Sequence, residues 1–155
     1  MRARDKSAGQ DNVARETAAR PPALHVLLRQ AHQALLIHQR RQLARLELTP
    51  LQVEALQALK GQRGVRQVEL ARRTGTDRSS MAELAARLEA RALIRRAPDP
   101  KDRRALLLFL TPKGRRLLAR AAPLLAAAEE EALAALTERQ RERLLSLLQR
   151  LAAPR

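Results

Sequence analysis

Two segments with the residues of a helix start enclose the one stretch of this sequence that is typical of β structure. At positions 49–52, Thr-Pro-Leu-Gln combines a capping hydroxyl, a proline suited to the first helical position and a glutamine that completes a capping box. At positions 111–114, Thr-Pro-Lys-Gly begins another helix in the same way. Between them, residues 93–97 and 105–110 are predicted strands joined by a charged turn rich in proline and aspartate. This order predicts a mainly α-helical fold with one two-stranded β-hairpin.

Apolar residues recur at steps of three and four along most of the remaining chain, which predicts helices with one buried side. The first predicted helix runs from Pro21-Pro22 to about Leu46. A short helix lies within residues 65–75, and another runs from about Asp77 to Arg91. The residues expected to be buried are Val68, Leu70 and Ala71 in the short helix and Met81, Leu84, Ala85 and Leu88 in the longer one.

Two further helices are predicted after the hairpin. The helix that follows Thr111 contains Pro123, which is expected to kink or divide it. The last helix begins at Thr137 and carries a row of leucines on one side, Leu144, Leu147, Leu148 and Leu151.

The charge of the chain points to a polyanionic partner. Its 155 residues include 31 Lys and Arg against 16 Asp and Glu, a formal net charge of +15. The simplest such partner is nucleic acid. Phe109 is the only aromatic residue, so the chain lacks the platforms on which single-stranded bases stack. A duplex, contacted through phosphates and groove edges, is therefore the expected partner.

Several classes of protein are excluded or disfavoured. The absence of cysteine excludes disulfides, thiolate zinc sites, iron–sulfur clusters and thiol redox sensors. His25 and His32 stand seven positions apart on one helix, too far to share a metal ion. No nucleophile–base pair, phosphate-binding loop or paired carboxylate site is visible, so we expect no enzyme activity, no metal and no cofactor. Without an apolar run that could span a membrane or act as a signal peptide, a cytoplasmic protein is expected.

A helix, a short turn containing glycine, a second helix and a β-hairpin form the outline of a winged helix-turn-helix. Six short segments along the chain add detail to this outline. They are 48–52 (Leu-Thr-Pro-Leu-Gln), 69–71 (Glu-Leu-Ala), 77–81 (Asp-Arg-Ser-Ser-Met), 87–89 (Arg-Leu-Glu), 99–104 (Asp-Pro-Lys-Asp-Arg-Arg) and 110–114 (Leu-Thr-Pro-Lys-Gly). In these segments the chain resembles the MarR family of bacterial transcription regulators.

The resemblance implies a domain organisation. Residues 21–155 would form a single domain, in which 47–114 are the DNA-binding lobe. Residues 21–46 and 115–155 would supply the long helices of a homodimer. Residues 1–20 have no hydrophobic period and are expected to form a mobile, disordered tail; whether this tail touches DNA phosphates or has no function is left open.

The resemblance assigns DNA recognition to the helix from about Asp77 to Arg91. Arg78, Ser79 and Ser80 stand at its N-terminal end, where free N–H groups and the helix dipole suit phosphate. Glu83 and Arg87 reach further and are the expected base contacts, since carboxylates and guanidinium groups match cytosine and guanine edges. Arg87 is equally suited to a phosphate.

The tip of the hairpin is the second expected contact. In such proteins an Arg near the wing tip enters the minor groove and is held by an Asp two residues earlier. Here that pattern falls on Asp102 and Arg104, with Lys101 and Arg103 beside them. Guanidinium groups suit the negative potential of a narrow minor groove. A role for Asp102 in stabilising the turn is an alternative that is compatible with the first.

The chain departs from the family pattern at two positions. A glycine usually precedes the apolar pair that begins the wing, where this chain has Ala92, and a glycine is also common where it has Glu47. If these positions need a positive φ, each non-glycine residue is strained by roughly 1 kcal/mol.

The resemblance also implies a cleft between the dimerisation helices and the DNA-binding lobe, in which relatives sense small aromatic or phenolic acids. His38 is a candidate polar contact for such an anionic effector, and Arg41, with Arg40 and Arg45, a candidate counter-charge. The alternatives are a hydrogen-bonded core or interface histidine and a solvated basic helix face.

These features together predict a sequence-specific, double-stranded-DNA-binding transcription regulator, a homodimeric repressor that a small-molecule effector releases from a pseudo-palindromic operator. A nucleoid-type architectural protein that coats DNA without sequence preference fits the charge equally well. A winged domain that binds an acidic protein partner is a further alternative.

Overall fold

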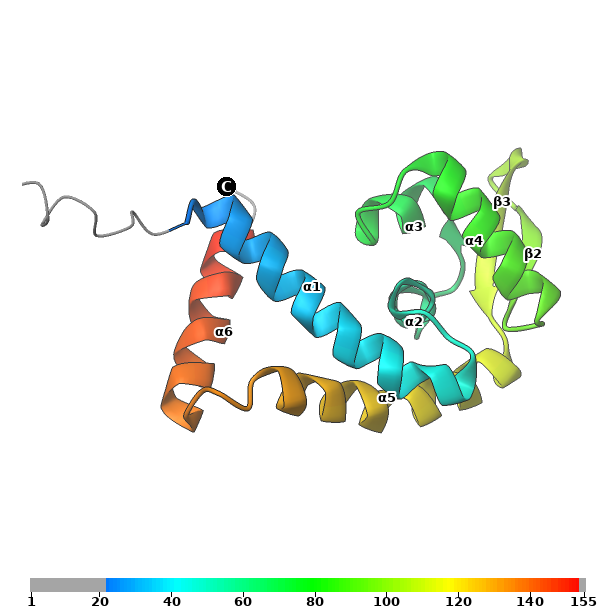
Figure 1. The fold of residues 1–155 in the computed structure, drawn as a ribbon. Helices are drawn as coiled ribbons and strands as arrows, with labels where there is room; N and C mark the ends of the chain where they lie inside the picture. Colours follow the sequence, from blue (N-terminus) through cyan, green and yellow to red (C-terminus); the bar gives the residue numbers. More distant parts are fainter. Residues whose placement is uncertain (1–21, 154–155) are drawn as a thin grey trace, which may run out of the picture. The chain divides into compact units, whose positions relative to one another are not determined.

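A computed structural model describes residues 22–153 of the chain, without the side chains of Arg103 and Arg104. Its contacts divide the chain into two units, residues 1–33 and 34–155. The described part of the first unit contains the beginning of helix α1, Leu24–Leu43 (Figure 1). The predicted tail, residues 1–20, lies outside the described residues. Every later element belongs to the second unit, to which the following description applies.

The second unit starts with the end of α1, a 3₁₀ turn η1 (Ala44–Leu46) and helix α2 (Pro50–Leu59). The first predicted helix is confirmed, with a 3₁₀ rather than an α-helical last turn. The Gln52 N–H donates to the Thr49 hydroxyl at 3.2 Å, and the Thr49 N–H donates to Gln52 Oε1 at 3.0 Å. This reciprocal pair is the predicted capping box.

The two central helices are α3 (Gln67–Arg73) and α4 (Arg78–Ala90). All four residues predicted to be buried in α4 are buried, as are Leu70 and Ala71 of α3. The prediction for Val68 is wrong, because this side chain is 52% exposed. Residues 65–66 form a strand, so α3 begins only at Gln67. Val68 then stands about 200° around the helix from Leu70, on the opposite side.

The predicted hairpin consists of β2 (Ile94–Asp99) and β3 (Asp102–Leu110). Both strands reach closer to the tip than expected, so that the turn is reduced to Pro100 and Lys101. The pairing register shifts between Pro98 and Asp99, which lets β2 continue past a proline.

A third strand joins this hairpin. Val65 pairs with Leu108 and Arg66 with Leu107, which gives an antiparallel sheet in the order β1-β3-β2, where β1 is Val65–Arg66. A strand of two residues has no detectable period, so it was absent from the sequence prediction.

Helices α5 (Pro112–Ala132) and α6 (Glu138–Ala152) complete the chain. Thr111 caps α5 by accepting a hydrogen bond from the Gly114 N–H at 3.0 Å, as predicted. The helix continues through Pro123 and is not divided there. A proline removes one backbone hydrogen bond, and the turns on either side are long enough to maintain the helix.

The core of the second unit joins α2, α3, α4 and the inner face of the sheet. Its largest fully buried side chains include Leu56 from α2, Leu70 from α3, Leu88 from α4 and Leu108 from β3. The fold is therefore the mainly helical winged helix-turn-helix that was predicted, with a small sheet of three strands. Among the described residues, no helix is long and apolar enough to span a membrane.

Both positions at which the sequence departs from a glycine pattern have left-handed backbones. The φ angles are 52° at Glu47 and 56° at Ala92. Neighbouring groups hold these conformations: the Arg91 guanidinium donates to the Glu47 carbonyl, and the Thr111 hydroxyl donates to the Ala92 carbonyl at 2.8 Å. The strain anticipated for a non-glycine residue therefore applies at both sites.

Candidate nucleic-acid interface

Helix α4 presents one polar face that is free of packing. Its N-cap is Asp77, whose Oδ1 accepts a hydrogen bond from the Ser80 N–H at 2.9 Å. Hydrogen bonds from Ser80 lower the pKa of Asp77, so the cap is ionised at neutral pH. The five predicted contact residues on this helix are all exposed: Arg78, Ser79, Ser80, Glu83 and Arg87. The inward stripe of α4 leaves this face available to a ligand.

The two expected base contacts lie beside each other. Arg87 Nη1 is 3.8 Å from Glu83 Oε2, one helical turn earlier, and both side chains are mostly exposed. An exposed ion pair of this kind is weak, so either side chain can give up the pair for a contact to DNA at a small cost in free energy.

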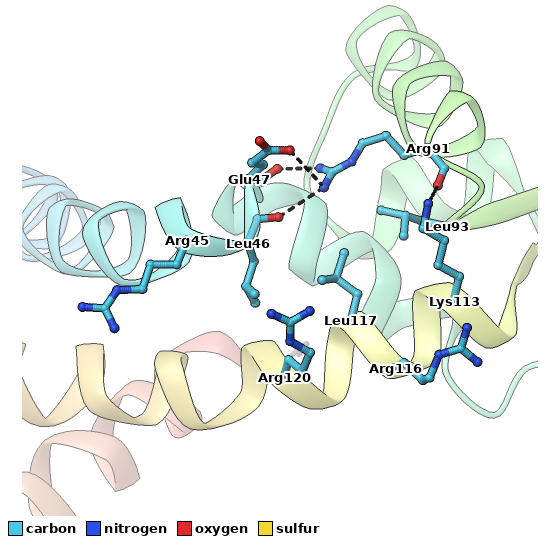
Figure 2. A pocket seen from close by; sticks show the side chains of 9 residues that line it. All are labelled: Arg45, Leu46, Glu47, Arg91, Leu93, Lys113, Arg116, Leu117 and Arg120. Atoms are coloured by element: carbon cyan, nitrogen blue, oxygen red, sulfur yellow. Dashed lines mark hydrogen bonds and ion pairs between the residues drawn. The ribbon is translucent and has the colours of Figure 1, made fainter.

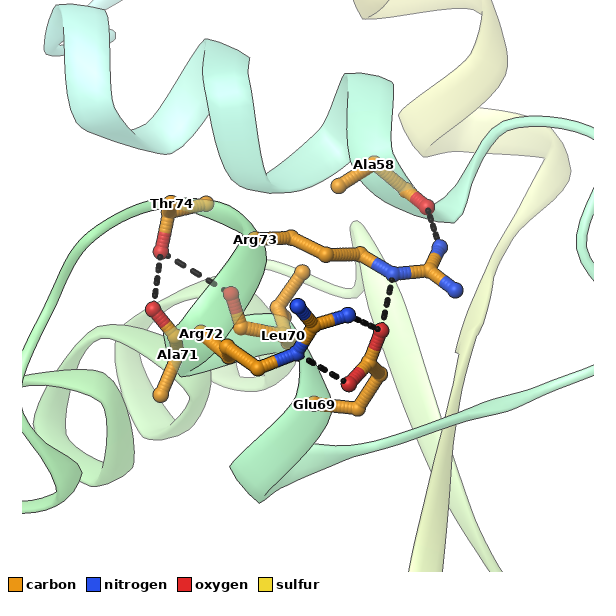
Figure 3. A network of polar contacts seen from close by, with 7 residues as sticks. All are labelled: Ala58, Glu69, Leu70, Ala71, Arg72, Arg73 and Thr74. Carbon is orange, nitrogen blue, oxygen red and sulfur yellow. Dashed lines mark hydrogen bonds and ion pairs between the residues drawn. The ribbon is translucent and has the colours of Figure 1, made fainter. Parts of the chain in front are cut away.

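A polar network fixes α3 at the end of α2 (Figure 3). Glu69 accepts hydrogen bonds from Arg72 Nε and Nη2, both at 2.9 Å, and from Arg73 Nε at 2.8 Å. Arg73 also donates to the Ala58 carbonyl at 3.3 Å. The Arg72 hydrogen bonds, and then those of Arg73, lower the pKa of Glu69 to about 2. The Arg73 hydrogen bond to the Ala58 carbonyl therefore ties the end of α3 to α2.

The tip end of the hairpin is fixed by a pair of residues that the sequence prediction did not select. Arg66 in β1 donates to Asp99 Oδ2 from Nε at 3.0 Å and from Nη2 at 2.6 Å. Asp99 is only 7% exposed, and its Oδ1 accepts from the Lys101 N–H at 2.9 Å. The Lys101 N–H, and next the Arg66 guanidinium, lower the pKa of Asp99, while Asp99 raises that of Arg66. The aspartate before Pro100 was the available sequence signal, but its partner lies on a strand that had no signal.

At the tip itself, Lys101 is exposed and Asp102 lies 3.6 Å from Arg66 Nη2. Asp102 thus faces the ion pair that holds the hairpin, in line with the turn-stabilising role considered for it. Residues 103 and 104 belong to β3, while the side chains of Arg103 and Arg104 lie outside the described part of the chain. Their predicted contacts stay predictions.

Two cations on β2 brace the hairpin. The Arg95 guanidinium lies over the Phe109 ring at 4.1 Å from its centroid, across a register pair of β2 and β3. Arg96 Nε lies 3.1 Å from Glu89 Oε2 and so links the end of α4 to the hairpin. The first contact lies within the hairpin, and the second positions the helix and the hairpin relative to each other.

The effector candidates lie elsewhere, near the end of α1. His38 Nδ1 is 2.9 Å from Glu131 Oε2, and Gln42 Nε2 donates to Glu131 Oε1 at 2.7 Å. The His38 hydrogen bond, and then that of Gln42, lower the pKa of Glu131, to which the nearby charge of Arg41 also contributes. His38 already has an acidic partner from α5, which the sequence could not reveal.

Comparison with known proteins agrees with this architecture. A family model described as MarR family matches residues 46–105. The transcriptional regulator HosA of Escherichia coli O111:H- is 32% identical over 105 residues, which cover 68% of this chain and 78% of the relative.

Two solved structures are also similar. The transcriptional repressor CouR, bound to a 23-mer DNA duplex, has a TM-score of 0.78 and 34% identity, and the match covers 84% of this chain and 93% of CouR. BpsR of Bordetella bronchiseptica, whose structure addresses the regulation of its DNA binding by 6-hydroxynicotinic acid, has a TM-score of 0.78 and 28% identity, with 86% and 96% covered. The chain described here therefore belongs to the MarR family of transcriptional regulators.

Proposed function

We propose that this regulator is a homodimeric repressor that reads a pseudo-palindromic operator through α4 and the β2–β3 hairpin. The observation that carries the proposal is the exposed polar face of α4, which is capped by Asp77 and braced against the hairpin by Arg96 and Glu89. The similar repressor CouR has been solved on a DNA duplex. A helix of this kind fits the major groove, and its N-terminal N–H groups suit phosphate.

The assigned contacts follow from position on these elements. Arg78, Ser79 and Ser80 at the start of α4 would contact phosphates, and Glu83 and Arg87 would read base edges. Lys101 and Arg103 would contact the backbone beside the minor groove, into which Arg104 would insert. In this scheme residues 47–114 form the DNA-binding lobe.

The dimer is supported by the unpaired apolar face of α6. Its 15 residues include none that is buried, and the exposed fractions are 51% for Leu145, 46% for Leu147, 37% for Leu148 and 58% for Leu151. Leucines at these spacings on a charged helix are expected to pack against a second copy of the chain. Two half-sites about one helical turn of DNA apart would then be read together.

Release by a small anionic or aromatic effector is supported by the similar regulator BpsR, whose DNA binding responds to 6-hydroxynicotinic acid. His38 and Arg41 are the candidate contacts in this chain. Because Glu131 already accepts a hydrogen bond from His38, an anionic effector would have to displace this carboxylate. Effector binding would favour a dimer geometry in which the two recognition helices no longer match the operator spacing.

The decisive experiment is a binding titration on the duplex upstream of the protein's own gene, with excess random DNA and across a salt series. A saturable complex that resists the competitor, with a footprint symmetric about a dyad, supports the specific repressor. Complete removal by random DNA supports the architectural alternative, which uses the same charge without sequence choice.

Arg104→Ala tests the minor-groove contact. We expect operator binding to weaken by roughly 1–3 kcal/mol while the protein stays folded and dimeric. Arg150→Ala, which removes one cation from the exposed end of α6, is the matched control and should leave affinity nearly unchanged. Equal affinities for both variants would remove Arg104 from the interface, and negligible DNA binding by the parent protein would favour an acidic protein partner.

A further inference from the structure

A cavity of about 340 Å³ lies where η1, the end of α4 and the start of α5 meet (Figure 2). All three elements belong to the second unit. The apolar part of its lining comes from Leu46 and Leu93, which are buried, and from the half-buried Leu117. The volume is within the range of small-molecule sites.

The charged side chains of the lining are mostly cationic. The lining contains five cations and one carboxylate: Arg45, Arg91, Lys113, Arg116, Arg120 and Glu47. Four of the five cations are exposed and remain hydrated: Arg45, Lys113, Arg116 and Arg120. The cavity therefore does not require a bound ion for folding.

Two of the cations already have hydrogen-bond partners within the protein. Arg91 donates to the Glu47 and Leu46 carbonyls, the latter at 3.2 Å, and lies 3.9 Å from the Glu47 carboxylate. Lys113 Nζ donates to the Arg91 carbonyl at 2.8 Å. Figure 2 shows these contacts along one side of the cavity.

The other three cations have no such role. Within the described residues, Arg45, Arg116 and Arg120 make no hydrogen bond or ion pair to a protein group. Arg116 and Arg120 are neighbours at i and i+4 on α5, an arrangement that is mildly destabilising for like charges. A bound anion would relieve this repulsion and receive several charge-assisted hydrogen bonds.

We propose that this cavity binds a small polyanion, a molecule with two or more carboxylate or phosphate groups. The reason is that Arg45, Arg116 and Arg120 bring three guanidinium groups from two elements to the lining, more cationic partners than a single carboxylate needs. The concave, leucine-based floor favours a compact solute over the extended backbone of a duplex. The cavity lining includes Arg45, which was grouped above with Arg41, but neither His38 nor Arg41. Binding of the polyanion does not depend on the DNA-binding proposal, whereas the regulatory route below rests on the proposed role of α4.

The position of the cavity also gives a route to regulation. Arg91 is the C-cap of α4, and its guanidinium holds the left-handed Glu47. A polyanion in the cavity would compete with the Leu46 and Glu47 carbonyls for this guanidinium. Binding would thus change the contacts of Arg91 at the C-terminal end of α4, the proposed recognition helix.

Isothermal titration calorimetry of the full-length protein, at constant ionic strength, tests the site with pyrophosphate and with citrate as probes. The test variant is Arg116→Ala/Arg120→Ala. The matched control is Arg139→Ala/Arg143→Ala, two exposed arginines with the same i, i+4 spacing on α6. Circular dichroism establishes that each variant is folded.

We expect saturable binding of at least one probe by the parent protein and the control, and binding at least ten-fold weaker in the test variant. Absence of saturable binding by the parent protein, or equal loss in both double variants, would overturn the proposal. A separate DNA titration of the test variant then assigns the cations: a loss of duplex affinity without any probe binding would overturn the proposal, since the cavity cations would serve duplex phosphates. Because the calorimetric titration contains no DNA, failure here is distinguishable from failure of the repressor proposal.

Discussion

Helices α4 and α6 have similar leucine spacing but opposite environments. In α4, Met81, Leu84 and Leu88 are at most 3% exposed, because α3 and the sheet cover them. In α6, Leu147 and Leu151 are 46% and 58% exposed, and no residue of the helix is buried. The comparison shows that the winged lobe completes its core within one chain, whereas the apolar face of α6 stays uncovered in a single chain.

The strongest test of this difference places charge on the open face. Leu144→Lys/Leu148→Lys should abolish the dimer, because two ammonium groups would have to be desolvated in an apolar interface. Sedimentation equilibrium of the purified protein measures the result. Ser146→Lys/Gln149→Lys, on the other side of the same helix, is the matched control and should remain dimeric. A dimeric Leu144→Lys/Leu148→Lys variant would show that the interface uses other helices.

A truncation in each region sharpens the comparison. Leu88→Ala should lower the free energy of unfolding by about 2–5 kcal/mol, since it leaves a cavity in a closed core. Leu148→Ala should cost less, and its effect should change with protein concentration because the lost contacts are between chains. Denaturant unfolding at two concentrations distinguishes them. A concentration-independent loss of similar size in both variants would contradict the comparison.

The left-handed backbone at Ala92 predicts that glycine at this position stabilises the protein. Ala92→Gly should raise the free energy of unfolding by roughly 1 kcal/mol, because glycine adopts the φ of 56° without a Cβ penalty. Ala86→Gly, the same chemical change on the exposed face of α4, should lower it by about 1 kcal/mol. Thermal unfolding measures both. Destabilisation by Ala92→Gly would mean that the left-handed backbone carries no strain.

The smallest effect concerns the network around Glu69. Its pKa is about 2 in the folded protein, below the ordinary value of 4.5, so the ionised form stabilises the fold. This stabilisation is complete above pH 4.5 and is lost as the pH falls from there toward 2. The parent protein should therefore show a steeper decline in Tm over this range than Glu69→Gln. Parallel curves would show that the network does not contribute to stability.

Local chemistry made much of the fold predictable. The Thr-Pro starts of α2 and α5 and the buried stripe of α4 depend on neighbours within one or two helical turns, so they could be derived from spacing alone. The left-handed backbones at Glu47 and Ala92 were anticipated by the family pattern. Strand β1 was not predicted, because pairing with β3 and not an intrinsic period decides it. Val68 was wrongly assigned to the buried side, although the helix period places it opposite Leu70.

The candidate site likewise has features that the sequence predicts and features that depend on the tertiary structure. The exposed residues of α4 follow from the helix period, but Arg66 and Asp99 are 33 positions apart and meet only because β1 joins the sheet. The pairing of His38 with Glu131 likewise requires α1 and α5 to lie side by side in the second unit. The basic cavity is the clearest case, since its cations come from segments that give no joint signal in the sequence.

The sequence by itself determined the order of the helices, their caps, the hairpin, the polar face of α4 and a charge suited to a duplex, because these properties depend on residues close together in the chain. The tertiary structure decided which leucines are covered, which carboxylate fixes the hairpin and where unpaired cations gather. These outcomes depend on contacts between distant segments, whose free energy is realised only when the core has brought them together.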